Sequence, residues 1–367
     1  MHVSQNLLPP EDFSPDEFTA EPAPSPWSPG VATGVGSMPG TDPAEAAATV
    51  FGELPDLPHL PELPARGLGA DLIGRTAGLL IDLPFEVVPS GYRVTAHPGA
   101  DQRRAIELLA RDLDALQEIA DRTGGRPNAV KVQVAGPWTL TADIELIRGH
   151  RVLTDAGALR EFGQSLAEGL AAHVAEVAAR TGAPVLVQLD EPTLPAVLAG
   201  RLPTPSGFGM VPAVGKHEAV ELLSTVIEAA KAASGRDVVV HCCAPNPPIA
   251  LLREAGADAL SLDATLLANG SAGIFDALGE AWDAGTLLLL GLVPSTDPAR
   301  PPTLHDVAKP ALDLVDRLGF PRTLLAERAV PTPTCGLAGA SQAWARRALT
   351  LTRELGQAFV EPPESWG

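Results

Sequence analysis

Short apolar runs recur along the chain, and most are followed by polar residues and then by a helix-length segment. The runs predict strands because they are rich in Val and Leu and are not joined by the turn residues typical of hairpins. Eight strands are predicted in this way, at residues 32–36, 57–63, 129–135, 185–189, 238–240, 259–262, 287–293 and 324–326.

Amphipathic segments lie between these runs. Their apolar residues recur three and four positions apart, a spacing that places them on one face of a helix. Several segments begin after Asp or Ser and are followed by Gly, residues that favour helix starts and ends. Helices are predicted at residues 105–122, 155–180, 217–234, 248–255, 273–284, 304–318 and 341–359.

The alternation of strands and helices predicts parallel βα units. Eight such units favour an α/β fold with a single (β/α)8 TIM barrel. Residues 1–30 hold seven prolines among acidic residues and are expected to form a loosely ordered arm, which leaves 31–367 for the barrel. Residues 66–125 are too many for a simple connection, so they predict an insertion after the second strand.

Composition narrows the range of partners and compartments. The 26 Lys and Arg residues against 45 Asp and Glu give a net charge of −19, which disfavours nucleic acid and anionic membranes. Three cysteines, two of them adjacent, cannot form a disulfide framework and fit a reducing compartment. With no signal-like N-terminus and no apolar run of about 20 residues, we expect a cytoplasmic protein.

Residues with metal-binding side chains follow several of the predicted strands. Asp190, His241 and Asp263 each end an apolar run, and active sites of such barrels lie at the carboxyl ends of the strands. Side chains alternate along a strand, so Cys243 faces the same way as His241. Cys335 offers a second sulfur, and imidazole with thiolates favours zinc. Packing of small buried side chains is the alternative that this pattern leaves open.

Four motifs along the chain support the metal interpretation. They are Gly36-Ser37-Met38-Pro39-Gly40, Gly136-Pro137-Trp138-Thr139-Leu140, Leu189-Asp190-Glu191-Pro192, and His241-Cys242-Cys243 with the later Cys335-Gly336-Leu337. In this order, over residues 31–360, the chain resembles the C-terminal catalytic zinc barrel of cobalamin-independent methionine synthases, in a short single-barrel form. The third motif is also compatible with a simple cap for the helix that follows it.

The resemblance implies a set of site residues. His241, Cys243 and Cys335 match the family's zinc ligands, and Asp263 stands where the family has a ligating glutamate. Asp190 matches the carboxylate that binds the ammonium of homocysteine. Three further residues are implied at the substrate, namely Ser37 in the loop that contacts the amino acid, Glu62 as a second acid for the ammonium, and Trp138 at the mouth.

The implied reaction is zinc-dependent methyl transfer to the thiol of homocysteine, which forms methionine. A thiol that binds zinc is deprotonated, which makes its sulfur nucleophilic. The methyl donor stays open between methyltetrahydrofolate and a methylcorrinoid protein. Full-length relatives carry a proton-donating histidine after the seventh strand, whereas residues 291–297 hold none and Thr296 lies about where it would fall.

Two rival interpretations remain at this point. A barrel like uroporphyrinogen decarboxylase would need no metal and would gather arginines around substrate carboxylates, but few arginines lie near the first predicted strand. A non-catalytic barrel that binds zinc or an amino acid is the other, and the missing histidine is its best support.

Overall fold

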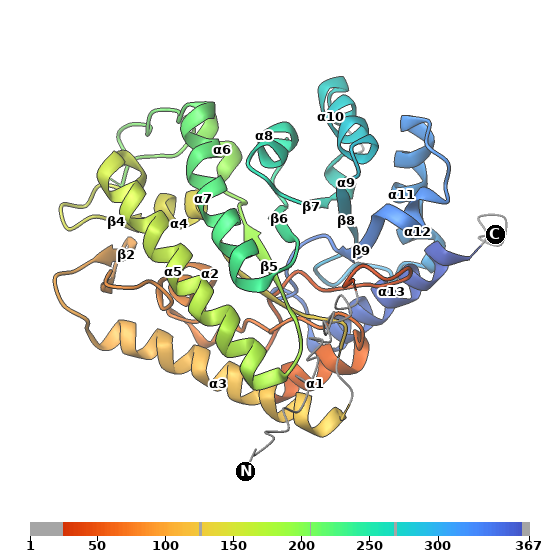
Figure 1. The fold of residues 1–367 in the computed structure, drawn as a ribbon, viewed down its shortest axis with the longest axis horizontal. Helices are drawn as coiled ribbons and strands as arrows, with labels where there is room; N and C mark the ends of the chain where they lie inside the picture. The colour runs from red at the N-terminus through yellow and green to blue at the C-terminus, as the bar shows by residue number, and fades with distance from the viewer. Residues whose placement is uncertain (1–24, 125–126, 206, 268–269, 362–367) are drawn as a thin grey trace, which may run out of the picture.

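The computed structural model describes residues 25–124, 127–205, 207–267 and 270–361. A curled parallel sheet of six strands, in the order β3-β5-β6-β7-β8-β9, forms its centre (Figure 1). The strands are β3 Val130–Ala135, β5 Val185–Asp190, β6 Val238–Cys242, β7 Ala259–Asp263, β8 Leu287–Val293 and β9 Ala329–Pro333. The sheet alternates with helices along the chain, so the α/β prediction is confirmed.

Two extended segments complete the ring where the first two strands were predicted. Residues 31–38 approach β9, with the Thr33 N–H donating to the Pro331 carbonyl at 3.5 Å, and residues 57–63 bridge to β3 through His59 and Lys131. A parallel bridge between Ser37 and Glu62 joins the two segments. Prolines at 58 and 61 remove two backbone donors from the second segment, which explains why it makes isolated bridges rather than a continuous ladder.

A small inner core shows that all eight positions of the barrel converge. Its buried residues come from both extended segments, from the residue just before β3 and from each of the other five strands. Such a layer of inward side chains is what fills the interior of a TIM barrel. The members are Val31, Leu57, Ala129, Leu186, Val239, Ala259, Leu287, Leu289 and Val330.

The last strand differs from its prediction. Residues 324–326 lie in the short helix α12, Leu324–Arg328, and the strand follows it as β9. Leu and Ala are strong helix formers, so a short apolar run containing them does not by itself distinguish a strand from a buried helical turn. The prediction was therefore wrong at this position, although the βα order is kept.

Helices pack against the outer face of the sheet, and the predicted ones lie close to their expected bounds. Asp155 caps α5 by accepting hydrogen bonds from the Gly157 and Ala158 N–H groups, and Thr303 with Asp306 forms a capping box at α11. Besides α12, the α-helices described are α1 Pro43–Glu53, α2 Leu72–Ala77, α3 Ala100–Thr123, α4 Pro137–Asp143, α5 Ala156–Thr181, α6 Leu194–Leu198, α7 Lys216–Ser234, α8 Ile249–Glu254, α9 Ala264–Leu267, α10 Ala272–Asp283, α11 Leu304–Leu318 and α13 Gln342–Val360.

The predicted insertion forms a small sheet beside the barrel. Strands β1 Phe85–Val88 and β2 Gly91–Val94 make a hairpin, and β2 pairs in parallel with β4 Ile144–Glu145. Two short 3-10 helices, at Pro64–Arg66 and Val152–Thr154, lie in the connections.

Residues 1–24 of the predicted arm lie outside the described residues. Trp27 is within them, and its indole N–H donates to Asp237 at 2.6 Å, next to the start of β6, while its ring packs against the inner core. The division of the chain at residue 30 stays a prediction. Within the described ranges, none of the helices combines the length and the apolar character needed to cross a membrane.

Gly169 on α5 provides a test of how this helix packs against the backbone at Leu79. A Cβ at Gly169 would lie 1.9 Å from the Leu79 carbonyl oxygen, so Gly169→Ala should lower the free energy of unfolding by about 1–3 kcal/mol. Gly52 is the matched control, because it is also helical and nothing lies within 4 Å of an added Cβ. Gly52→Ala should raise stability by about 0.5–1 kcal/mol. Urea unfolding measures both, and equal effects would contradict the packing.

Candidate metal centre

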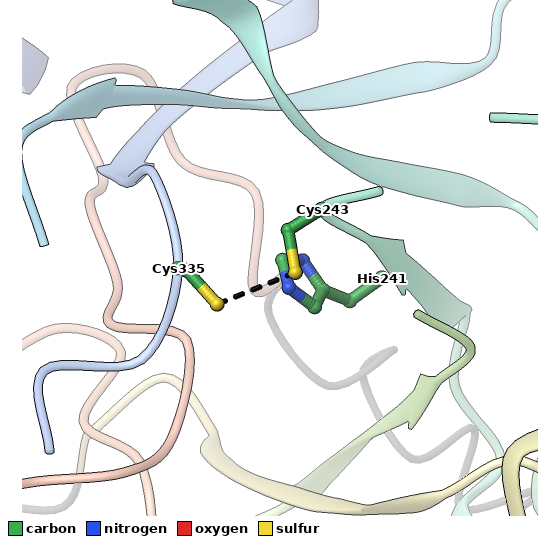
Figure 2. A group of neighbouring side chains, drawn as sticks. All are labelled: His241, Cys243 and Cys335. Carbon is green, nitrogen blue, oxygen red and sulfur yellow. Dashed lines mark hydrogen bonds between the residues drawn. The ribbon is translucent and has the colours of Figure 1, made fainter. Parts of the chain in front are cut away.

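Three metal-binding side chains meet at the carboxyl-terminal rim of the barrel. His241 lies on β6, Cys243 follows that strand, and Cys335 follows β9 (Figure 2). Their ligand atoms all lie within 4.8 Å of one another, and the two sulfurs are 3.3 Å apart. Ligand atoms of one tetrahedral zinc ion lie about 3.5–4 Å apart. The cluster can therefore hold a metal ion.

Strand geometry explains how β6 supplies two ligands. Side chains alternate along the strand, so His241 and Cys243 face the rim while Cys242 is directed into the hydrophobic core, where it is buried. Figure 2 shows the imidazole and the Cys243 sulfur on the same side of the strand end, toward Cys335.

The loop with the third ligand is held against the first extended segment. The Leu337 N–H donates to the Ser37 carbonyl at 2.8 Å. A Cβ at Gly336 would lie 2.0 Å from Ser37 Oγ, so any larger residue here would displace the Ser37 hydroxyl. Two motifs from opposite ends of the sequence, around Ser37 and around Cys335, are thereby brought together.

His241 is oriented as a ligand. Its Nδ1 lies 2.9 Å from Ser261 Oγ on the neighbouring strand β7. Its Nε2 is buried and has no hydrogen-bond partner among the described residues. A buried polar atom without a partner is costly, and a metal ion would satisfy it. Ser261 then has the role of the outer partner that fixes the ring of a ligating histidine.

The two thiols influence each other's protonation. The contact with Cys243 and the nearby His241 imidazole lower the pKa of Cys335, against the opposing effect of burial. The same contact, together with burial, raises the pKa of Cys243. One sulfur of the pair thus loses its proton readily, and the thiolate is the form that binds metals.

Two carboxylates lie close to this cluster. Asp190 ends β5 and pairs in register with His241, and its Oδ1 accepts a hydrogen bond from Gln188 at 2.7 Å. Glu62 lies on the second extended segment, beside Ser37. Burial raises the pKa of Glu62 to about 7, with Arg75 opposing the shift and the charge of Asp190 adding to it. The two acids are therefore near enough to interact.

Comparison with known families classifies this arrangement. Residues 31–358 match the family model described as the cobalamin-independent synthase catalytic domain. The chain belongs to this family. The resemblance recognised from the sequence motifs is thereby confirmed.

Solved structures share the fold of this chain. A B12-independent methionine synthase from Shewanella sp. W3-18-1, in complex with selenomethionine, is 12% identical with a TM-score of 0.56, and the match covers 90% of this chain and 98% of that one. A methyltransferase from Methanosarcina mazei is 17% identical with a TM-score of 0.52, over 90% of this chain and 93% of that one. No match was found among curated proteins.

Asp263, predicted as the fourth ligand of the synthase site, lies outside the cluster of three. It ends β7, and its Oδ1 accepts hydrogen bonds from the Thr265 N–H at 2.9 Å and the Thr265 hydroxyl at 2.6 Å. This carboxylate thus already has local partners. Its coordination of a metal stays a prediction.

Trp138 has a different environment from the one expected. Its side chain is fully buried, and its indole N–H donates to the Ala219 carbonyl of α7 at 2.9 Å. The ring therefore packs between α4 and α7 rather than lining an open mouth. Its predicted contact with the substrate is not tested by this geometry.

Glu191 links two of the family motifs in a way that sequence reasoning missed. Its buried carboxylate accepts hydrogen bonds from the N–H groups of Trp138 and Thr139, at 2.9 and 2.8 Å, and from the Thr139 hydroxyl at 2.8 Å. The acid thus caps α4, not the helix that follows it in sequence. A Cβ at Gly136 would lie 2.4 Å from Glu191 Oε1, which explains the glycine.

Lys131, Gln133 and Gln188 were also missed as site residues. They occupy inward positions of β3 and β5, and all three are buried. A usable signal was present in the sequence, because polar residues at alternate positions of an otherwise apolar strand share one face.

Removal of a sulfur ligand tests the metal centre. Cys335→Ser should lower zinc affinity by more than about 100-fold, because even outer partners of a metal site contribute 10–100-fold. Elemental analysis after equilibration with zinc under reducing conditions measures the metal bound per chain. Cys242→Ala is the matched control, since the neighbouring sulfur is directed into the core, and it should keep its metal. Full zinc content in the Cys335 variant would rule out the three-ligand site.

Proposed function

We propose that this protein transfers a methyl group to the thiol of homocysteine and forms methionine, with a zinc ion held by His241, Cys243 and Cys335. The observation that carries the proposal is the convergence of these ligands, with Cys243 and Cys335 separated by 92 positions, around a His241 Nε2 that has no other partner in the described structure. One nitrogen and two sulfurs form a ligand set that favours zinc.

The carboxylates of Asp190 and Glu62 suit the amino-acid end of the substrate. Both are buried beside the metal ligands, so an ammonium group that enters would replace water with two charged partners. The Shewanella enzyme with the same fold was solved in complex with selenomethionine, which contains selenium in place of the sulfur of methionine. This supports an amino acid as the ligand of this protein.

The protein contributes mainly by positioning. Zinc, when bound, supplies a Lewis acid that favours the thiolate form of the substrate sulfur. Ser261 holds the His241 ring so that Nε2 faces the sulfurs. Asp190 and Glu62 hold the ammonium, which orients the substrate sulfur for attack on the methyl donor.

The methyl donor in this proposal is methyltetrahydrofolate, with a methylcorrinoid protein as the second candidate. Residues 291–297, at the end of β8, hold no histidine. The nearby Asp297 accepts hydrogen bonds from the Ser341 N–H and hydroxyl at 2.7 and 2.6 Å. The proton donor of the histidine-containing relatives therefore has no direct counterpart in this segment.

The need for reduced cysteines supports a cytoplasmic location.

Methionine formation is the direct test. Zinc-loaded protein should convert homocysteine with methyltetrahydrofolate or, in a separate assay, with methylcobalamin as a chemical probe for the corrinoid route. Asp190→Asn should lower kcat/KM by about 30-fold or more, because it removes one partner of a buried charge pair. Cys242→Ala should leave the rate unchanged. Turnover with neither donor, despite bound zinc and homocysteine, would favour a non-catalytic binding barrel.

The raised pKa of Glu62 predicts a pH effect on amino-acid binding. As the pH falls through about 7, Glu62 gains a proton and loses its charge, so it attracts an ammonium less strongly. The affinity for L-methionine, which has no titrating thiol, should therefore decrease several-fold between pH 8 and pH 6. Calorimetric titration measures this decrease. Glu62→Gln should bind more weakly at pH 8 and show a flatter profile, and an unchanged profile would contradict the role of Glu62.

A further inference from the structure

A fully buried lysine lies beneath the candidate substrate site. Lys131 on β3 has no exposed surface and no carboxylate within ion-pair distance among the described residues. Its Nζ instead donates to the Val35 carbonyl at 2.8 Å, to Gln133 Oε1 at 3.2 Å and to Gln188 Oε1 at 2.7 Å. The three N–H groups of an ammonium are all used in this way. A buried cation with only neutral partners destabilises the fold, so a role in stability does not explain this lysine.

The hydrogen bond from Lys131 fixes the orientation of the Gln188 amide. Lysine can only donate, so the amide oxygen must face it and the NH₂ group must face away. That NH₂ donates to Asp190 Oδ1 at 2.7 Å and to the Val35 carbonyl at 3.0 Å. A flipped amide would place its oxygen against both of these acceptors. Because of Lys131, Asp190 therefore faces the NH₂ group of Gln188 rather than its amide oxygen.

Gln133 forms a second arm from the same ammonium. Its Oε1 accepts from Lys131, and its Nε2 donates to the Leu60 carbonyl on the extended segment that also carries Glu62. Leu60 lies two residues before Glu62, so this bond fixes the backbone of the segment next to that acid. Gly36 makes room for this arm, because a Cβ there would lie 2.8 Å from Gln133 Cγ.

We propose that Lys131, Gln133 and Gln188 are positioning residues that make the barrel specific for thiols carrying an ammonium group, by holding the carboxylates of Asp190 and Glu62 in place. The inference rests on the proposed function for the sulfur end of the substrate. Two buried carboxylates side by side repel each other, and the cation below them offsets part of this repulsion. Gln188 carries that support to the Asp190 carboxylate as a hydrogen bond, and Gln133 carries it to the backbone of the segment that holds Glu62, so both acids stay directed at the ammonium.

Ligand selectivity distinguishes this role from a purely structural one. We compare L-homocysteine with 4-mercaptobutanoate, which keeps the thiol and the carboxylate but lacks the amino group, by calorimetric titration of zinc-loaded protein. The wild type should prefer homocysteine. Gln188→Leu should lower homocysteine affinity by about tenfold or more, since it removes a hydrogen bond to a buried charge, while the affinity for 4-mercaptobutanoate changes by less than about twofold.

Two further variants make the result independent of folding defects. Gln188→Glu hardly changes the size of the side chain and keeps an acceptor for Lys131, but it places an oxygen against Asp190. We therefore expect a selective loss of affinity for homocysteine. Lys131→Met removes the donor to both Gln133 and Gln188, so it should reduce the preference for homocysteine over 4-mercaptobutanoate more than Gln188→Leu does. Thr352→Val is the control, because it removes a buried hydroxyl whose hydrogen bond in the described structure goes to the Ala348 carbonyl within α13. Zinc content is measured for every variant.

The outcomes separate the inference from the proposed function. If Gln188→Leu and Gln188→Glu lose affinity for both ligands equally, or lose none, the positioning role is overturned while the thiol site stands. A wild type that binds both ligands equally would overturn the ammonium specificity. A zinc-loaded wild type that does not bind homocysteine would overturn the proposed function itself, and the inference with it.

Discussion

The register of a parallel barrel is the constraint on which the site depends. Parallel strands in register place their carboxyl ends at one rim, and Asp190, His241 and Ser261 lie side by side because β5, β6 and β7 pair in that register. Each strand needs to supply only one or two side chains for a site to form. A slip of one residue in β6 would direct Cys242 to the rim and turn His241 and Cys243 into the core.

Closure of the ring brings in the third ligand. Cys335 reaches the other two because β9 lies next to the first extended segment, which in turn bridges to the segment with Glu62. The contact between Gly336 and Ser37 ties this loop to the opposite end of the sequence. The metal ligands and the acids for the substrate thus come from segments that only the closed barrel makes neighbours.

The interior of the barrel changes in character from one end to the other. The inner core at the amino-terminal end is apolar, whereas the layers above it contain Lys131, Gln133, Gln188 and the two acids. Buried polar groups destabilise a fold unless they are paired, and here most of them bond to one another. Polar residues in place of an apolar core are expected where function requires them. Gly36 provides the space for Gln133 in this network, and Gly136 provides the space for Glu191, which caps α4.

Local patterns in the sequence determined much of this fold. Strands such as 129–135 and 287–293 and helices such as 155–180 follow from side-chain periodicity, which depends only on near neighbours in the chain. The same alternation put His241 and Cys243 on one face. The spaced motifs indicated the family, since each keeps its own local sequence. Lys131 and Gln133 were readable from alternation too, but a polar position in a strand does not reveal its partner.

Only the tertiary structure decided which distant groups meet. It placed Cys335 against Cys243, gave Asp263 local partners in Thr265, directed the indole of Trp138 to α7 and made Glu191 the cap of α4. It also moved the last strand to 329–333, because pairing with β8 and with the first extended segment, not local propensity, selects which residues extend. These outcomes depend on contacts between residues far apart in the chain, whose energies no local pattern contains.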